Sequence, residues 1–115
     1  MKDDGVYLAH IRDAAQRILD YTAAGEDDFR SDTKTQDAVI RGFEIIGEAT
    51  KRLSPAFVAA HPEIPWKRIA GMRDKLIHDY FGVNLDIVWD TVTGVIPVFV
   101  SQVEDLIRVL GDPRG

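Results

Sequence analysis

The segment 73–80 contains the side chains of this sequence best suited to acid–base and phosphate chemistry: Arg73, Asp74, His78 and Tyr80. At about 100° per residue on a helix, Asp74 and His78 share one face as an i,i+4 pair, whereas Arg73 and Tyr80 share another. A carboxylate one turn before an imidazole can orient the ring and stabilise its protonated form. Arg73 and His78 lie about 140° apart, so a second copy of the helix, facing the first, would bring them together better than one helix does.

These groups suit metal-independent cleavage of RNA. An imidazole with a pKa near neutrality can take the proton from a ribose 2′-OH or give one to the leaving 5′-oxygen. A guanidinium group can hold the phosphate and stabilise the charge that develops on it. The spacing also permits a structural interpretation, in which Arg73, Asp74 and His78 form surface ion pairs and Tyr80 packs its ring.

Apolar residues recur at spacings of three and four along most of the chain, which is typical of amphipathic helices. The spacing predicts long helices from Leu8 to Thr22, from about Asp32 to Leu53, from Trp66 to about Phe81 and from Leu85 to Leu110. A short helical turn, Ala56–Ala60, fits between the prolines that follow the second of these.

Several residues mark where the helices begin and end. Residues 26–31 are expected to form a polar connector after Gly25, and Thr33 with Gln36 has the spacing of a capping box. Gly82 is expected to end the third helix and Asn84 to cap the fourth, which Pro97 should kink. Residues 95–100 could form a short strand by composition alone, but the heptad spacing on both sides favours helix.

Residues 1–115 are therefore expected to form a single all-α domain, an up-and-down bundle of four main helices with a short extra helical turn. The second helix carries a stripe of mostly small residues: Ala38, Gly42, Ile45 and Ala49. This stripe could pack within the molecule or form part of a dimer face, and the sequence leaves both open.

The chain of 115 residues has no cysteine and a net charge of −5. The lack of cysteine excludes disulfides and thiol chemistry, and the charge gives no overall basic surface for nucleic acid. A local positive rim could still form from Lys51, Arg52, Lys67, Arg68 and Lys75, although these are equally well explained as solvated surface charges. The first residues lack a signal-peptide pattern and no apolar run is long enough to span a membrane, so a cytoplasmic location is expected.

No metal or cofactor is expected. His10 and His61 have no second ligand at a metal-like spacing, and no glycine-rich loop could cradle a phosphate. Glu48 and Arg52 are spaced to form a helical ion pair. Trp66 and Trp89 stand at core-facing positions, which favours packing over base stacking.

The pattern Arg-x4-His-x-Tyr at Arg73, His78 and Tyr80 resembles the signature of the HepT-like branch of the HEPN superfamily. These proteins are ribonuclease toxins of bacterial and archaeal toxin–antitoxin pairs. The resemblance extends over roughly residues 6–110 and includes the segments 46–49, 61–66, 71–73 and 81–83.

The resemblance implies a helical homodimer in which two Arg-x4-His motifs form a composite cleft that cleaves RNA. Arg73 and His78 would be the catalytic pair, with Asp74 at the polar position after the arginine. It also implies a small nucleotidyltransferase antitoxin of the MNT type, which neutralises the toxin by masking it or by transferring AMP to Tyr80. AMP there would place bulky negative charge beside Arg73.

Two other functions remain compatible with the residues. One is a non-catalytic helical module that binds a nucleotide or the nucleotidyltransferase and uses Tyr80 only as a modification site. The other is a purely structural helical assembly.

Overall fold

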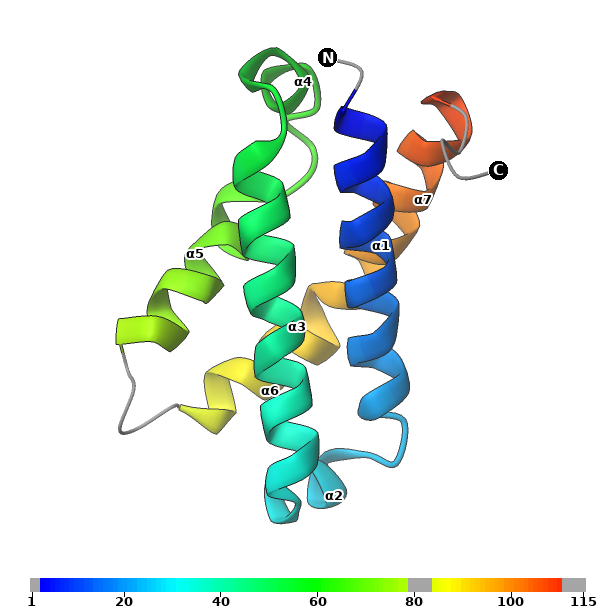
Figure 1. The fold of residues 1–115 in the computed structure, drawn as a ribbon. Coiled ribbons are helices and arrows are strands. Elements are labelled where there is room, and N and C mark those ends of the chain that lie inside the picture. The colour runs from blue at the N-terminus through cyan, green and yellow to red at the C-terminus, as the bar shows by residue number, and fades with distance from the viewer. Residues whose placement is uncertain (1–2, 79–83, 111–115) are drawn as a thin grey trace.

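The computed structural model of the chain describes residues 3–78 and 84–110 (Figure 1). Within these residues the chain forms seven helices and no strand, which confirms the all-α fold. The helices are α1 (Asp4–Tyr21), α2 (Glu26–Ser31), α3 (Thr33–Arg52), α4 (Pro55–Ala60), α5 (Trp66–His78), α6 (Leu85–Gly94) and α7 (Ile96–Leu110).

The two longest helices, α1 and α3, lie side by side, and each contacts a further helix. Helix α5 packs on α3, and α7 packs on α1 (Figure 1). The apolar faces of these four helices enclose a core that includes Ile11, Ile18, Phe43, Ile69 and Phe99, all 0% exposed. The bundle therefore forms because each amphipathic helix buries one stripe against its neighbours.

Polar side chains begin three of the helices. Asp32 accepts a hydrogen bond from the Lys34 N–H at the start of α3, and Asn84 accepts two from the first turn of α6. Ser54 accepts one from the Phe57 N–H at the start of α4. The cap of α3 is thus Asp32, and the predicted pairing of Thr33 with Gln36 is wrong, because the Gln36 amide donates to carbonyl oxygens of α2 instead.

The segment 26–31 is a helix, α2, and the expected polar connector is wrong. Gly25 precedes it with a φ of 101°, a conformation that glycine adopts without strain. Phe29 is fully buried and its ring lies 5.3 Å from that of Trp89. Burial of this one large side chain fixes an otherwise acidic turn against the bundle.

The chain after Asn84 forms two helices, not one helix kinked at Pro97. The break lies at Val95, whose φ and ψ are −116° and −46°. Proline at 97 has no N–H and its ring clashes with the carbonyl group of residue 93 in a continuous helix. Helix α6 therefore ends at Gly94, and Pro97 is accommodated in the first turn of α7.

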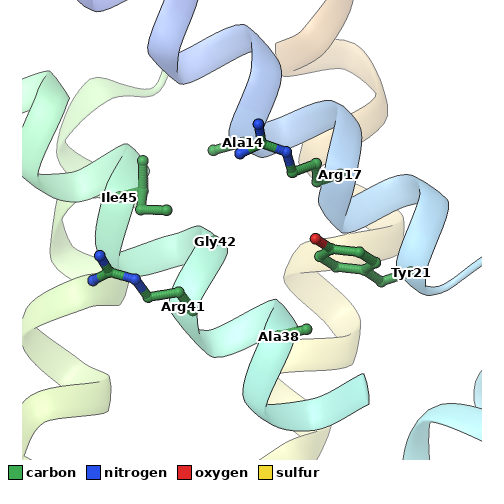
Figure 2. Close-up of a pocket in the computed structure, with 7 residues that line it drawn as sticks. All are labelled: Ala14, Arg17, Tyr21, Ala38, Arg41, Gly42 and Ile45. Atoms are coloured by element: carbon green, nitrogen blue, oxygen red, sulfur yellow. The ribbon is translucent and has the colours of Figure 1, made fainter. Parts of the chain in front are cut away.

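The stripe of small residues on α3 packs partly within the molecule. Gly42 is buried against α1: a Cβ atom at this position would lie 2.7 Å from Ile18 Cγ1. On the outer side, Ala38, Gly42 and Ile45 line a surface pocket of about 200 Å³ (Figure 2). The remaining lining residues are Ala14, Arg17, Tyr21 and Arg41. Glycine at 42 thus sets the close approach of α1 to α3.

A buried carboxylate joins the start of α1 to the junction of α3 and α4. Asp4 is 5% exposed, and it accepts hydrogen bonds from the Ser54 N–H at 2.8 Å and the Ser54 hydroxyl at 2.7 Å. Burial raises the pKa of the Asp4 carboxyl, but the hydrogen bonds from Ser54 contribute to a larger opposite effect, so the pKa lies below its usual value.

Asp4→Asn should destabilise the fold by about 1 to 2 kcal/mol at pH 7, because hydrogen bonds to a charged acceptor are lost. The folded-state pKa is lowered, so this stabilisation is present above the unfolded pKa of about 3.9 and is lost as the pH falls through the folded value. Urea unfolding of both proteins between pH 7 and pH 3 should show the difference shrinking in acid. Asp3→Asn is the matched control, since Asp3 makes no capping hydrogen bond; an equal effect of the two substitutions would contradict the role of Asp4.

No helix in the described part of the chain combines the length and apolar character needed to cross a membrane.

Candidate active site

Arg73 lies on the side of α5 that packs on α3. Gly47 of α3 faces it, and a Cβ atom at position 47 would lie 2.6 Å from Arg73 Cβ and 2.9 Å from its Cδ. The missing side chain at Gly47 therefore lets the aliphatic part of Arg73 rest on α3. Because the Arg73 side chain is still 29% exposed, it is held by the packing and can also reach solvent.

Asp74 joins two positive side chains from two helices. Its Oδ1 lies 3.2 Å from Lys51 Nζ on α3 and 3.4 Å from Arg73 Nη1 on α5. The hydrogen bond from Lys51, with the charges of Lys51 and Arg73, outweighs desolvation and holds the pKa of Asp74 below its usual value. The carboxylate is therefore ionised at neutral pH and holds Arg73 and Lys51 to one edge of the α3–α5 interface.

His78 is the last residue of α5, so the helix brings its backbone to the end of the same element that carries Arg73 and Asp74. The predicted ion pair of Asp74 with His78 concerns a side chain outside the described part of the structure, as does the expected place of Tyr80 beside Arg73. The same holds for Gly82 as the end of the helix. These predictions stay predictions.

The residues of the expected positive rim lie on different surfaces. Lys51 pairs with Asp74, whereas Arg52 lines a pocket between α1 and α3 and lies 3.7 Å from Glu48, as the sequence predicted. Lys67, Arg68 and Lys75 gather in a third place, a cavity between α5 and α6. The structure therefore brings only these three together.

That cavity is called here the α5–α6 groove, and it has a volume of about 360 Å³. It is lined by Lys67, Arg68, Gly71, Met72 and Lys75 of α5 and by Ile87 and Thr91 of α6. A smaller cavity shares Met72, Lys75 and Ile87 with it and extends to Asn84 at the start of α6. The groove thus follows α5 toward its last turn.

The remaining candidates of the sequence have structural roles. Trp66 is 5% exposed and packs edge to face with Phe99, and Trp89 contacts Phe29, which confirms both as packing residues. The His61 ring lies beside Glu63, with Nδ1 and Oε2 3.4 Å apart. The described residues contain no cluster of three or more His, Asp or Glu side chains that could hold a metal ion.

The sequence analysis did not predict the contacts that two residues make with the site. Gly47 faces Arg73 across the α3–α5 interface, and Lys51 pairs with Asp74 across the same interface. Glycine inside a long helix lowers stability by about 1 kcal/mol relative to alanine. The presence of glycine at position 47 despite this loss could have indicated a close contact with another helix.

Comparison with known proteins assigns the chain to a family. The model of the "Ribonuclease HepT-like" family matches residues 11–106. A protein of Thermococcus cleftensis named "Probable ribonuclease HepT" is 48% identical over 101 residues, which cover 87% of this chain and 92% of that protein. A protein of Methanocaldococcus jannaschii named as a "Putative RNase" is 44% identical over 108 residues, covering 93% and 89%.

No solved structure matches the chain significantly. The family match extends over most of the helical bundle and includes α3 and the whole of α5, with Gly47, Arg73, Asp74 and His78. The chain belongs to the HepT-like ribonuclease family.

Proposed function

We propose that the protein is a metal-independent endoribonuclease whose catalytic residues are Arg73, Asp74 and His78. The observation that carries this proposal is the fixed arrangement of Arg73 on α5. Its stem rests against Gly47, and its guanidinium group lies beside the ionised Asp74 on the helix that ends at His78. A cation held in this way is organised before substrate binds, which is what stabilisation of a phosphate transition state requires.

The proposed reaction is an attack by a ribose 2′-oxygen on the adjacent phosphorus. The bond from phosphorus to the 5′-oxygen breaks, and the products carry a 2′,3′-cyclic phosphate and a 5′-hydroxyl group. His78 takes the proton of the 2′-OH or supplies the proton of the leaving 5′-oxygen, Arg73 binds the phosphate oxygens, and Asp74 orients the cations around them.

The proposal also includes a homodimer and a protein partner that inhibits it. Arg73 and His78 stand about 140° apart on α5, so facing copies of α5 from two protomers would complete a composite cleft. The partner is a nucleotidyltransferase antitoxin of the MNT type, which would block the cleft by transferring AMP from ATP to the Tyr80 hydroxyl with release of pyrophosphate. The protein is then the toxin of a toxin–antitoxin pair.

The direct test is cleavage of a labelled single-stranded RNA by the purified protein in the presence of excess chelator. Fragments that end in 2′,3′-cyclic phosphate are expected, whereas the same oligonucleotide with every 2′-OH methylated should stay intact. Cleavage that needs an added divalent metal, or fragments with 5′-phosphate ends, would contradict the mechanism. Intact RNA with a folded protein would favour the non-catalytic binding module.

A further inference from the structure

We infer that the α5–α6 groove binds the phosphodiester backbone of the RNA strand that enters the active site. This inference rests on the proposed function, because it assigns a path to the substrate of the same site. Three exposed cations, Lys67, Arg68 and Lys75, line the groove, and none of its described lining residues is acidic. Polyanion binding depends on such concentrated positive charge.

Unlike several other basic residues of the described chain, the three cations have no carboxylate partner, which is also true of Arg17, Lys34 and Arg41. Arg30 pairs with Glu26 and Asp86, Arg52 with Glu48, and Lys51 and Arg73 with Asp74. No salt bridge involves Lys67, Arg68 or Lys75 in the part of the molecule that the structure describes. In a chain with a net charge of −5, a groove lined by three cations and no carboxylate is a local concentration of positive charge that suits an anionic ligand.

The shape of the groove fits an extended strand better than a single small anion. Its volume is about 360 Å³, and Met72 and Ile87 add apolar surface against which a ribose or base can lie. Arg68 and Lys75 are separated by about 10 Å along the axis of α5, at 1.5 Å per residue. The groove therefore offers cationic contacts at more than one point along a backbone.

The groove also runs along α5 toward the end of the helix that carries His78. Position 78 of α5 lies about 20° from Gly71 around the helix axis, so the backbone of His78 continues the face that lines the groove. The smaller cavity at Met72 and Lys75 extends the groove toward this end of α5. A strand held at Lys67 and Arg68 would thus be led along the helix toward His78.

The test uses binding without cleavage. The probe is a fluorescein-labelled single-stranded RNA in which every 2′-OH is methylated, so attack by the 2′-oxygen is impossible. Its Kd is measured by anisotropy at several salt concentrations for wild type and for Lys67→Ala/Arg68→Ala. The double variant should bind on the order of tenfold more weakly, and the slope of log K against log salt should fall by about 1.4, or 0.7 per lost phosphate contact.

The matched control is Arg17→Ala/Arg41→Ala, which removes the same charge from the pocket between α1 and α3 (Figure 2). Its Kd should stay within about twofold of wild type. Equal weakening by the two double variants would overturn the inference, because net charge alone would explain the binding. An unchanged Kd in Lys67→Ala/Arg68→Ala, or no binding by wild type, would also overturn it.

The outcome for the groove is separable from that of the proposed function. Weakened binding by Lys67→Ala/Arg68→Ala alone, in a protein that leaves unmodified RNA intact, would support the groove and contradict the ribonuclease mechanism. Cleavage of unmodified RNA with the same salt slope in both proteins would support the mechanism and overturn the groove.

Discussion

His78→Ala should lower the rate of RNA cleavage by on the order of 10³-fold, because a positioned general acid or base contributes about 10² to 10⁴. The fold should survive, since position 78 is the last of α5 and the described buried residues of this helix, Trp66, Ile69, Met72 and Leu76, lie before it. The measurement is single-turnover cleavage of a labelled RNA, with helical content and urea unfolding recorded on the same preparation.

The control for this variant is the methylated RNA probe, whose Kd should change little, because His78 is proposed to act on protons and Arg73 on the phosphate. Growth after induced expression without an antitoxin gives a second readout, in which wild type arrests growth and His78→Ala does not. A His78→Ala protein that cleaves RNA at the wild-type rate would remove His78 from the mechanism.

Gly47→Ala should lower cleavage by on the order of 10²-fold through displacement of Arg73, a loss typical of a catalytic group moved by about 1 Å. The added methyl group would lie 2.6 Å from Arg73 Cβ, closer than packed carbon atoms can approach, so Arg73 or the whole of α5 must move away from α3. Overpacking of this kind costs about 1 to 3 kcal/mol of stability, partly offset by the better helix propensity of alanine.

Two glycine variants separate displacement of Arg73 from loss of stability. Gly42→Ala crowds Ile18 at the α1–α3 interface to a similar degree, at 2.7 Å, without contact to Arg73. Gly94→Ala meets no atom within 4 Å and should not destabilise the fold. Cleavage per folded molecule should therefore fall in Gly47→Ala and stay near wild type in the other two. An equal loss in Gly47→Ala and Gly42→Ala would assign the effect to packing in general.

The long helices could be predicted from sequence because their apolar stripes repeat over several turns. Helices α1 and α3 begin and end within a few residues of the expected bounds, and Asn84 caps α6 as its position suggested. Helix α2 was missed because it has only one buried side chain, Phe29, in a run of acidic residues. A single apolar residue gives no periodicity, so only the tertiary contact with Trp89 shows why this turn is ordered.

The break at Val95 was missed for the opposite reason. Apolar spacing continues across it, since Val92, Ile96 and Phe99 are all buried in the same core. Periodicity records which face is buried but not whether the axis is continuous. The ring of Pro97 would clash with the preceding helical turn, and the chain avoids this clash by a break between α6 and α7 and not by a kink.

The candidate site could be predicted in its residues but not in its contacts. Arg73, Asp74 and His78 lie on one helix as expected, because their spacing is local. Lys51 and Gly47 could not be assigned to the site, since their roles depend on which face of α3 meets α5. Pairings between helices arise from packing of whole faces, and one sequence does not specify them residue by residue.

The contact of the first helix with the last has a consequence for how this chain is made. Helix α7 covers α1, and its buried residues Phe99, Val100 and Val103 belong to the same core as Leu8 and Ile11. A nascent chain on the ribosome therefore exposes the apolar face of α1 until nearly the whole domain has been translated. The bundle can close only after α7 has been synthesised, so an RNA-cleaving site in this fold would mature late in the synthesis of the domain.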